Sequence, residues 1–185
     1  LLLTDAPQQL LPTIVSRCQR VDLNTVRELD EPWRGRVIET LASPLLRSPI
    51  EKQVMAGMLF AILAEMKEKA EQLVKEEDAT NVVAEEEDSD VFEARVSARY
   101  REMRTDFFLT VMRWFRDLLL IKSGGADELV YNPSQLAVLR ERGARLTLVQ
   151  ALYNVTAVEE LARQMERNLS EENVLTYALD RINHG

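Results

Sequence analysis

The sequence predicts an all-α protein built as a helical bundle. Of its 185 residues only six are Gly and six are Pro, while 46% are hydrophobic. Such a composition is typical of helical proteins, because Gly and Pro are the residues that helix interiors tolerate least. Two long segments also repeat apolar residues at intervals of three and four positions, which is the spacing of one face of an α-helix.

The segment before the first long helix is expected to hold only short elements. Residues 1–4 (Leu-Leu-Leu-Thr) predict a buried strand that ends in a small polar residue. Pro12 then marks a turn before the Ser-Arg-Cys tripeptide at 16–18. We interpret residues 24–48 as a connector that contains one short helix, at about 33–41, where apolar residues recur at helical spacing.

A first long helix is predicted from Pro49 to about residue 75. Proline is tolerated at a first helical position because its missing N–H would have no partner there, and Ser48 before it is a good N-cap. We expect one apolar stripe of this helix to face the core. The stripe consists of Ile50, Val54, Met58, Ile62, Met66 and Leu73.

An acidic segment follows at 76–90 and is predicted to be a flexible, solvated connection between two helices. Its four consecutive carboxylates at 85–88 do not predict a metal site. Neighbouring side chains point in different directions on any regular element, whereas a cation needs converging ligands.

A second long helix is predicted at 90–122, ended by the glycine pair at 124–125. We expect it to be buried on two sides, because its apolar stripe is wide. The stripe contains Phe92, Val96, Tyr100, Met103, Phe107, Val111, Trp114, Leu118 and Ile121, and it is widened by Phe108, Phe115 and Leu119. The polar face carries Arg95, Arg99, Arg101 and Arg104, which we expect to pair with the acidic segment or with a partner subunit.

Three more helix boundaries follow from capping residues. Asn132 and Pro133 predict a helix start, a further helix is expected to run to about residue 167, and Ser170 predicts the N-cap of the last helix. The predicted packing face of that last helix is Leu175, Ala178, Leu179 and Ile182.

Composition excludes several classes of function. Acidic residues outnumber basic ones by 31 to 23, a net charge of −8, and no basic stripe is visible, so little direct DNA binding is expected. The single cysteine, Cys18, excludes an internal disulfide framework and fits a cytoplasmic location. No apolar run is long enough to cross a membrane, and no signal peptide is visible. Because the chain starts without Met inside a predicted strand, we expect it to be a fragment of a longer protein.

No catalytic constellation stands out. His184 is the only histidine and lies one residue from the end, so it is a poor candidate for a base or ligand, and Cys18 has no histidine near it. We therefore expect no metal, no cofactor and no enzymatic activity of the chain by itself.

Four motifs occur in the order found in one family. They are Leu-Leu-Pro-Thr-Ile-Val-Ser-Arg-Cys at 10–18, Arg-Asp-Leu-Leu-Leu-Ile-Lys at 116–122, Asn-Pro at 132–133, and a helix end with Arg163 and Asn168. In this respect the chain resembles the C-terminal part of bacterial DNA polymerase III clamp-loader subunits of the delta-prime (gamma/tau-like) family. The resemblance covers about 1–23 and 100–183. It departs in the middle, where the family's Gly-rich lid motif is missing, and this departure favours delta-prime over gamma/tau.

The resemblance implies a domain organisation and a role. Residues 1–23 correspond to the tail of an AAA+ core, 24–48 to a connector or degenerate lid, and 49–185 to a helical collar domain with an acidic loop at 76–90. The implied partners are the gamma/tau and delta subunits, with the sliding clamp and primed DNA reached through the complex.

Two residues have implied roles at ATP, which neighbouring subunits would hold. Thr4 takes the position of a nucleotide-sensing residue. Arg17 takes that of an arginine finger that acts in trans on the adjacent subunit. An arginine suits this role because its rigid, always-charged fork stabilises the charge that develops on a transferred phosphoryl group.

A different class of function also fits the pattern. A helical adaptor or scaffold domain, unrelated to replication, would dimerise through the long helix at 90–122. The wide apolar stripe of that helix is compatible with either an internal core or a dimer interface.

Overall fold

The computed structural model describes residues 31–44, 48–80, 89–165 and 170–183, and these residues are all-helical. The chain divides into two compact units, Leu1–Glu31 and Pro32–Gly185, and the description below concerns the second. The strand predicted at 1–4 lies outside the described residues.

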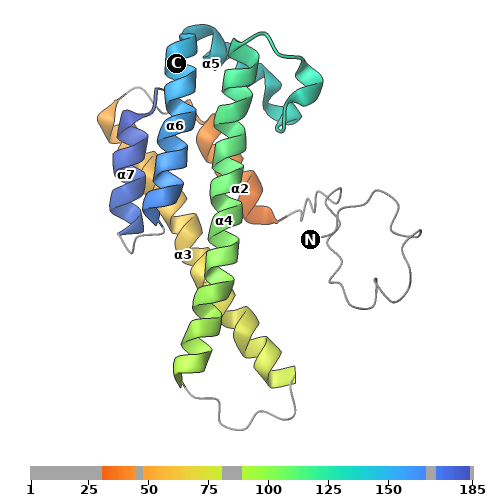
Figure 1. Ribbon diagram of the computed structural model, residues 1–185, viewed down its shortest axis with the longest axis vertical. Coiled ribbons are helices and arrows are strands. Elements are labelled where there is room, and N and C mark those ends of the chain that lie inside the picture. Colours follow the sequence, from red (N-terminus) through yellow and green to blue (C-terminus); the bar gives the residue numbers. More distant parts are fainter. Residues whose placement is uncertain (1–30, 45–47, 81–88, 166–169, 184–185) are drawn as a thin grey trace, which may run out of the picture. The chain divides into compact units, whose positions relative to one another are not determined.

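The second unit is a bundle of α-helices in which α4 occupies the central position (Figure 1). Helix α4 packs against α2, α3, α5 and α6, while α7 packs against α3 and α6. The helices are α2 (Pro32–Ala42), α3 (Pro49–Thr80), α4 (Ser89–Lys122), α5 (Leu136–Arg145), α6 (Leu148–Met165) and α7 (Glu171–Arg181), and two 3-10 turns, η2 (Asp127–Leu129) and η3 (Pro133–Gln135), lie between α4 and α5. The predicted helical bundle is confirmed.

The core is built around the aromatic side chains of α4. Phe107, Trp114 and Phe115 are almost completely buried. Trp33 of α2 packs against Phe107 with ring centroids 6.3 Å apart, within the range of favourable aromatic pairs. As predicted, α4 is buried on more than one side, because helices cover it from several directions.

The stripe predicted to bury α3 is wrong over its first half. Ile62 and Met66 are buried, but Ile50 is 74% exposed, and Val54 and Met58 are exposed as well. Helix α3 carries a second apolar stripe at the same spacing, and this stripe faces the bundle. It consists of Met55, Ala56, Leu59, Ile62, Leu63, Met66, Ala70 and Val74. Periodicity alone does not decide between two stripes, because both satisfy the helical repeat.

The predicted N-cap positions are confirmed at Ser48, Asn132 and Ser170, but only Ser48 makes a side-chain capping hydrogen bond. The N–H of Glu51 donates to Ser48 Oγ (3.3 Å) and the N–H of Ser48 donates to the Glu51 carboxylate (2.8 Å), which is a capping box. Asn132 and Ser170 precede η3 and α7, but neither side chain makes a capping hydrogen bond. At the end of α4, Gly124 has φ +75°, a conformation that glycine adopts without strain, as expected for a helix stop.

The acidic segment is partly helical, which corrects the prediction for 76–90. Helix α3 continues to Thr80 and α4 already begins at Ser89. Basic residues of α4 form ion pairs with acidic residues in the part of α3 that extends beyond the predicted helix end. Arg99 Nη2 lies 2.6 Å from Glu77 Oε1, and Arg95 pairs with Glu77 and Asp78. The expected pairing of Arg95 and Arg99 with the acidic segment is therefore confirmed.

A buried arginine joins α2 to α5. Arg142 donates to the carbonyl oxygens of Leu41 (2.5 Å) and Ser43, and its guanidinium lies 5.8 Å from the centre of the Trp114 ring. Burial lowers the pKa of Arg142 from its usual value. Helix α2, which lies in the stretch interpreted as a connector, is thus fixed to the same compact unit as the later helices.

A buried carboxylate fixes the turn after α4. Asp117 is 0% exposed, and its two oxygens accept hydrogen bonds from the N–H groups of Tyr131 and Asn132 (2.9 Å each) and from Asn132 Nδ2 (2.8 Å). Asn132 thus stands at the predicted N-cap position, but its side chain binds α4 instead of the first turn that it precedes.

We expect Asp117→Ala to lower the free energy of unfolding by about 3 kcal/mol. The substitution leaves three donors in a buried place without their charged acceptor. Urea denaturation followed by circular dichroism measures the effect. Glu159→Ala, at an exposed position of α6, is the control and should change stability by less than about 0.5 kcal/mol. Equal midpoints for the two variants would contradict the anchoring role of Asp117.

Candidate functional site

Helix α6 has an apolar stripe on its solvent side in addition to the one in the core. Leu148, Val149 and Leu152 are exposed, and Val149 reaches 75%. The opposite side of the helix is buried through Ala151, Asn154, Val158, Leu161 and Met165. A helix that stabilises its fold with one face and keeps aliphatic side chains on the other has a surface available for a partner.

Local hydrogen bonds fix where α6 begins. The N–H of Gln150 donates to Thr147 Oγ1 (3.2 Å), and the N–H of Thr147 donates to Gln150 Oε1 (2.8 Å). This reciprocal pair is a capping box of the Thr-x-x-Gln type. Because the first turn is held in this way, the exposed leucine and valine of that turn have a defined position.

Two tyrosines and one arginine extend the surface onto α7. Arg181 Nε donates to the hydroxyl of Tyr153 (2.8 Å), and its Nη1 donates to the hydroxyl of Tyr177 (2.7 Å). The guanidinium carbon also lies 5.7 Å and 5.3 Å from the two ring centres, within the range of cation–π contacts. These hydroxyl groups hold the pKa of Arg181 above its usual value.

The end of α7 is fixed independently of this arginine. Lys52 of α3 donates to the carbonyl oxygen of Asp180 (2.6 Å). Buried Asn154 of α6 exchanges two hydrogen bonds with the backbone of Asn183, at 2.6 Å and 2.8 Å. Consequently α3, α6 and the residues after α7 form one rigid support beneath the exposed side chains.

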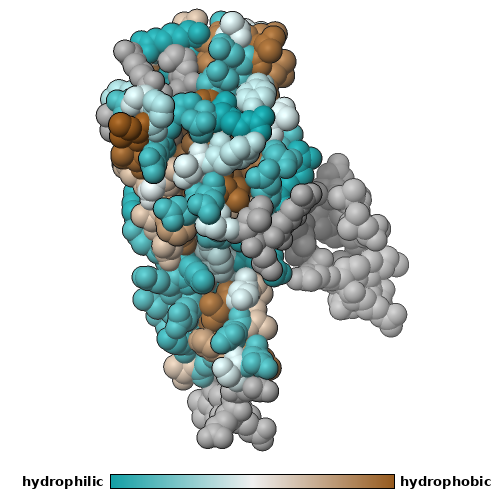
Figure 2. Space-filling model, turned by 90° about the vertical axis from the view of Figure 1, so that its left-hand side faces the viewer, coloured by the Kyte–Doolittle hydropathy of each residue, from teal (hydrophilic) through white to brown (hydrophobic). Residues whose placement is uncertain are grey.

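We refer to Leu148, Val149, Leu152, Tyr153, Tyr177 and Arg181 together as the α6–α7 surface. Tyrosine and arginine surrounded by aliphatic side chains are typical of the central part of protein–protein interfaces. Figure 2 views the molecule from the α7 side of Figure 1 and shows apolar patches separated by hydrophilic side chains. The side chains of the α6–α7 surface offer apolar contacts, ring faces and hydrogen-bond donors.

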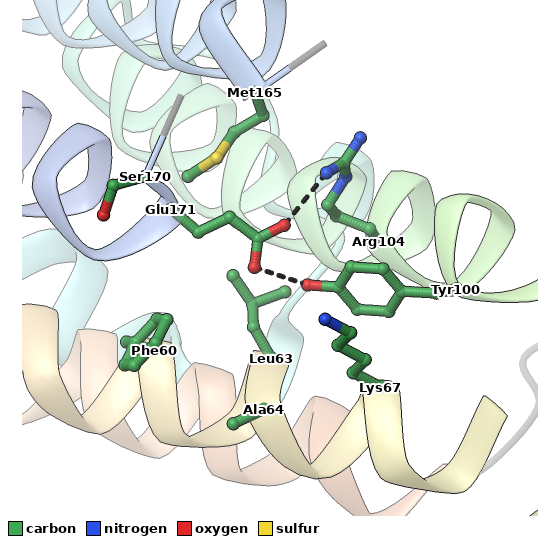
Figure 3. A pocket seen from close by; sticks show the side chains of 9 residues that line it. All are labelled: Phe60, Leu63, Ala64, Lys67, Tyr100, Arg104, Met165, Ser170 and Glu171. Atoms are coloured by element: carbon green, nitrogen blue, oxygen red, sulfur yellow. Dashed lines mark hydrogen bonds and ion pairs between the residues drawn. The ribbon is translucent and has the colours of Figure 1, made fainter. Parts of the chain in front are cut away.

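A pocket of about 550 Å³ lies between α3, α4, α6 and the start of α7 (Figure 3). Its lining combines an apolar wall with a polar end. The residues are Phe60, Leu63, Ala64, Lys67, Tyr100, Arg104, Met165, Ser170 and Glu171. Figure 3 shows the side chains of Tyr100 and Arg104 pointing toward Glu171.

The polar end of this pocket joins α7 to α4. The hydroxyl of Tyr100 donates to Glu171 Oε2 (2.6 Å), and Arg104 Nη1 donates to Glu171 Oε1 (2.9 Å). Both carboxylate oxygens are therefore engaged, which makes Glu171 an anchor for the start of α7 rather than a free base. Burial, together with the hydrogen bond to Glu171, raises the pKa of Tyr100 well above its usual value.

Most of the residues singled out from the sequence are not among those that the structure describes. Thr4, Arg17, Cys18, Asn168 and His184 lie outside the described residues.

Of the two residues that define the last sequence motif, Arg163 and Asn168, the structure describes only Arg163. This side chain is exposed on α6, where it pairs with Glu160 at 3.2 Å. Among residues 31–44, 48–80, 89–165 and 170–183, no group of three or more His, Cys, Asp or Glu side chains is placed to hold a metal ion. Within the same ranges, no helix has the length and apolar character needed to cross a membrane.

Comparisons with protein-family models, with curated proteins and with solved structures gave no match to this chain.

The α6–α7 surface was missed when only the sequence was considered. One signal was present, because Leu148, Val149 and Leu152 do not fit the core stripe of their own helix. The pairing of Arg181 with tyrosines of two different helices leaves no trace in the sequence, since it depends on how α6 and α7 pack.

We expect the stability of the protein to fall as pH rises above about 10, in part through Tyr100. Below the ordinary phenol pKa of about 10 both states hold the proton, whereas above it only the unfolded state loses it, so unfolding becomes more favourable. Urea midpoints measured from about pH 9 to about pH 11 test this. Tyr100→Phe should show a smaller decrease than the wild type, and Tyr131→Phe, at an exposed ring, serves as the control. A Tyr100→Phe curve parallel to that of the wild type would contradict the assignment.

Proposed function

We propose that this chain is a non-catalytic subunit of a bacterial DNA polymerase III clamp loader of the delta-prime type. In this role its helical bundle takes part in the collar that holds the subunits together. The complex as a whole would use ATP to place the sliding clamp on primed DNA. The chain would reach DNA and the clamp through its partners, in keeping with its net charge of −8.

The observation that carries the proposal is the α6–α7 surface. It presents aliphatic side chains beside two tyrosines and an arginine, on α6, which has a capping box, and on α7, whose end is fixed from below. A rigid surface loses little conformational entropy on binding, which favours association. The sequence resemblance places the collar in this same part of the chain, and the all-helical architecture is compatible with it.

The proposal also gives Arg17 a role at the ATP of a neighbouring subunit. Its role is to stabilise the charge on the ATP phosphates held by the adjacent gamma/tau subunit, and Thr4 takes the nucleotide-sensing position. The chain itself holds no cofactor in this proposal.

The adaptor that dimerises through α4 is the second hypothesis, and the packing of α4 makes it less attractive. Most of its large apolar side chains lie within the bundle, and among the described residues of α4 only Val91 and Leu109 are large, apolar and exposed. A homodimer through this helix would therefore bury little apolar area, which is the main source of stability in obligate dimers.

We expect the wild-type chain to co-elute with gamma/tau and delta subunits in size-exclusion chromatography with light scattering. Val149→Glu should weaken this association at least about tenfold, because it places a charge at the most exposed aliphatic side chain of the proposed interface. Val91→Glu makes the same change at an exposed position of α4 and should associate as the wild type does. Failure of the wild-type chain to join the complex contradicts the proposal, and a stable homodimer would favour the adaptor.

We expect Arg17→Ala to leave assembly intact and to lower the clamp-stimulated ATPase activity of the complex at least about tenfold. Arginine fingers contribute roughly 10³–10⁵ to the rate in GTPases, and other sites in the complex would remain active. Steady-state phosphate release measures the effect, with chromatography of the same sample as the control for assembly. Wild-type hydrolysis by the mutant complex would contradict the role of Arg17.

A further inference from the structure

A second cluster of tyrosine and arginine lies on α4 and on the turn that follows η2. The guanidinium carbons of Arg113 and Arg116 lie 4.9 Å and 4.6 Å from the centre of the Tyr131 ring. Both distances are well inside the range of cation–π contacts. The three side chains form what we call the Arg–Tyr–Arg cluster, which lies on a different part of the bundle from the α6–α7 surface.

The cluster is held in place by the backbone around Tyr131. The N–H of Tyr131 donates to buried Asp117, and Arg116 Nη1 donates to the carbonyl oxygen of Leu129 (3.2 Å). The ring therefore lies against α4 because its own main chain is bonded there. Since the tyrosine holds both guanidinium groups, less side-chain freedom remains to be lost when a ligand binds.

One of the two charges of the cluster has no ion-pair partner within the described part of the chain. Arg116 pairs with buried Asp117 at 3.7 Å, and that carboxylate also accepts three hydrogen bonds from the turn. Arg113 has no carboxylate partner among the described residues. The acids nearest to Arg113 in sequence are Asp117, which pairs with Arg116, and Asp106, which pairs with Arg34 of α2. Near Tyr131, Asp127 pairs with Arg140 of α5, and Glu128 is exposed.

Apolar side chains flank the cluster. Leu109 precedes Arg113 by one helical turn and is 44% exposed, and Leu129, whose carbonyl oxygen binds Arg116, is 58% exposed. Exposed leucines beside two guanidinium groups match a ligand that carries both carboxylates and apolar side chains. A guanidinium binds a carboxylate through two parallel hydrogen bonds, and this geometry is stronger than a single contact.

We propose that the Arg–Tyr–Arg cluster, together with Leu109 and Leu129, is a docking site for an acidic segment with leucine-like side chains in a partner protein. The inference goes beyond the proposed collar function and does not depend on it, because it uses α4 and the turn after η2 instead of α6 and α7.

A peptide segment explains the cluster better than nucleic acid does. Binding of a polyanion depends on many cations that follow the phosphate backbone, whereas this cluster supplies two guanidinium groups and one ring on a chain of net charge −8. The leucines also have no role at a phosphate backbone.

The acidic residues at 85–88 of the same chain do not reach the cluster. The stretch of α4 from Ser89 to Arg113 is about 36 Å long at 1.5 Å per residue. Four residues before Ser89 extend at most ~14 Å. The acidic run that directly precedes α4 is therefore not the occupant that we propose.

Binding of defined fluorescent probes to the full chain tests the proposal by anisotropy. The main probe is a peptide of Leu-Glu-Glu repeats, and the comparison probes are Leu-Gln-Gln repeats, Ser-Glu-Glu repeats and oligothymidylate. We expect the Leu-Glu-Glu peptide to bind best. The amide signals of Tyr131 and Asn132 should shift in the NMR spectrum when it is added.

We expect Arg113→Gln to weaken binding of the Leu-Glu-Glu peptide at least about tenfold, because it removes the charged hydrogen bonds that the guanidinium would donate to a carboxylate. Tyr131→Leu keeps the main-chain bond to Asp117 and should weaken binding as well. Arg101→Gln is the matched control, because it removes the same charge from an exposed position of the same helix.

Several outcomes would overturn the proposal. They are no binding of the Leu-Glu-Glu peptide, equal binding of the Ser-Glu-Glu peptide, or an Arg113→Gln variant that is helical by circular dichroism and binds as the wild type does. Tighter binding of oligothymidylate than of any peptide would replace it with a nucleic-acid site. Equal losses in Arg113→Gln and Arg101→Gln would show a general charge effect and would also overturn it.

Discussion

The burial of the aromatic face of α4 is the constraint on which the rest of the bundle depends. Phe107, Trp114 and Phe115 need cover from several directions, and α2, α3, α5 and α6 supply it. Large rings contribute much of the apolar area that a core removes from water. Because α2, α3, α5 and α6 all pack on α4, burial of its aromatic face determines which face of each of these helices remains exposed.

Buried polar side chains then determine how the connecting segments lie on this core. Asp117 binds the turn after η2, Arg142 binds the end of α2, and Asn154 binds the backbone after α7. Each side chain satisfies backbone groups that would otherwise be buried without a partner, at a cost of roughly 1–3 kcal/mol each. The contacts of Asp117 and Asn154 also fix the segments next to the exposed clusters, so stability and surface chemistry have a common origin there.

The sequence allows a good prediction of α4 and α7, because each has a single strong apolar stripe. It fails for the first half of α3, where Ile50 and Val54 compete with a second stripe that tertiary packing selects. It gives the N-cap positions Asn132 and Ser170 correctly but not their hydrogen bonds, since the Asn132 side chain binds Asp117 instead of capping its helix. The exposed clusters could not be predicted, because each combines residues from separate elements. The role of Arg17 stays a prediction.

The α6–α7 surface and the Arg–Tyr–Arg cluster each contain an arginine that lies against a tyrosine ring. In a chain with 31 acidic and 23 basic residues, an exposed arginine is readily neutralised by a nearby carboxylate of the same molecule. In the described part of the chain, Arg113 and Arg181 instead rest against tyrosine rings, which occupy the face of the guanidinium and leave its charge in place. An arginine held by a ring keeps its ability to bind a carboxylate from another molecule, whereas one held by an acid does not. The tyrosines therefore preserve positive recognition sites on an acidic protein.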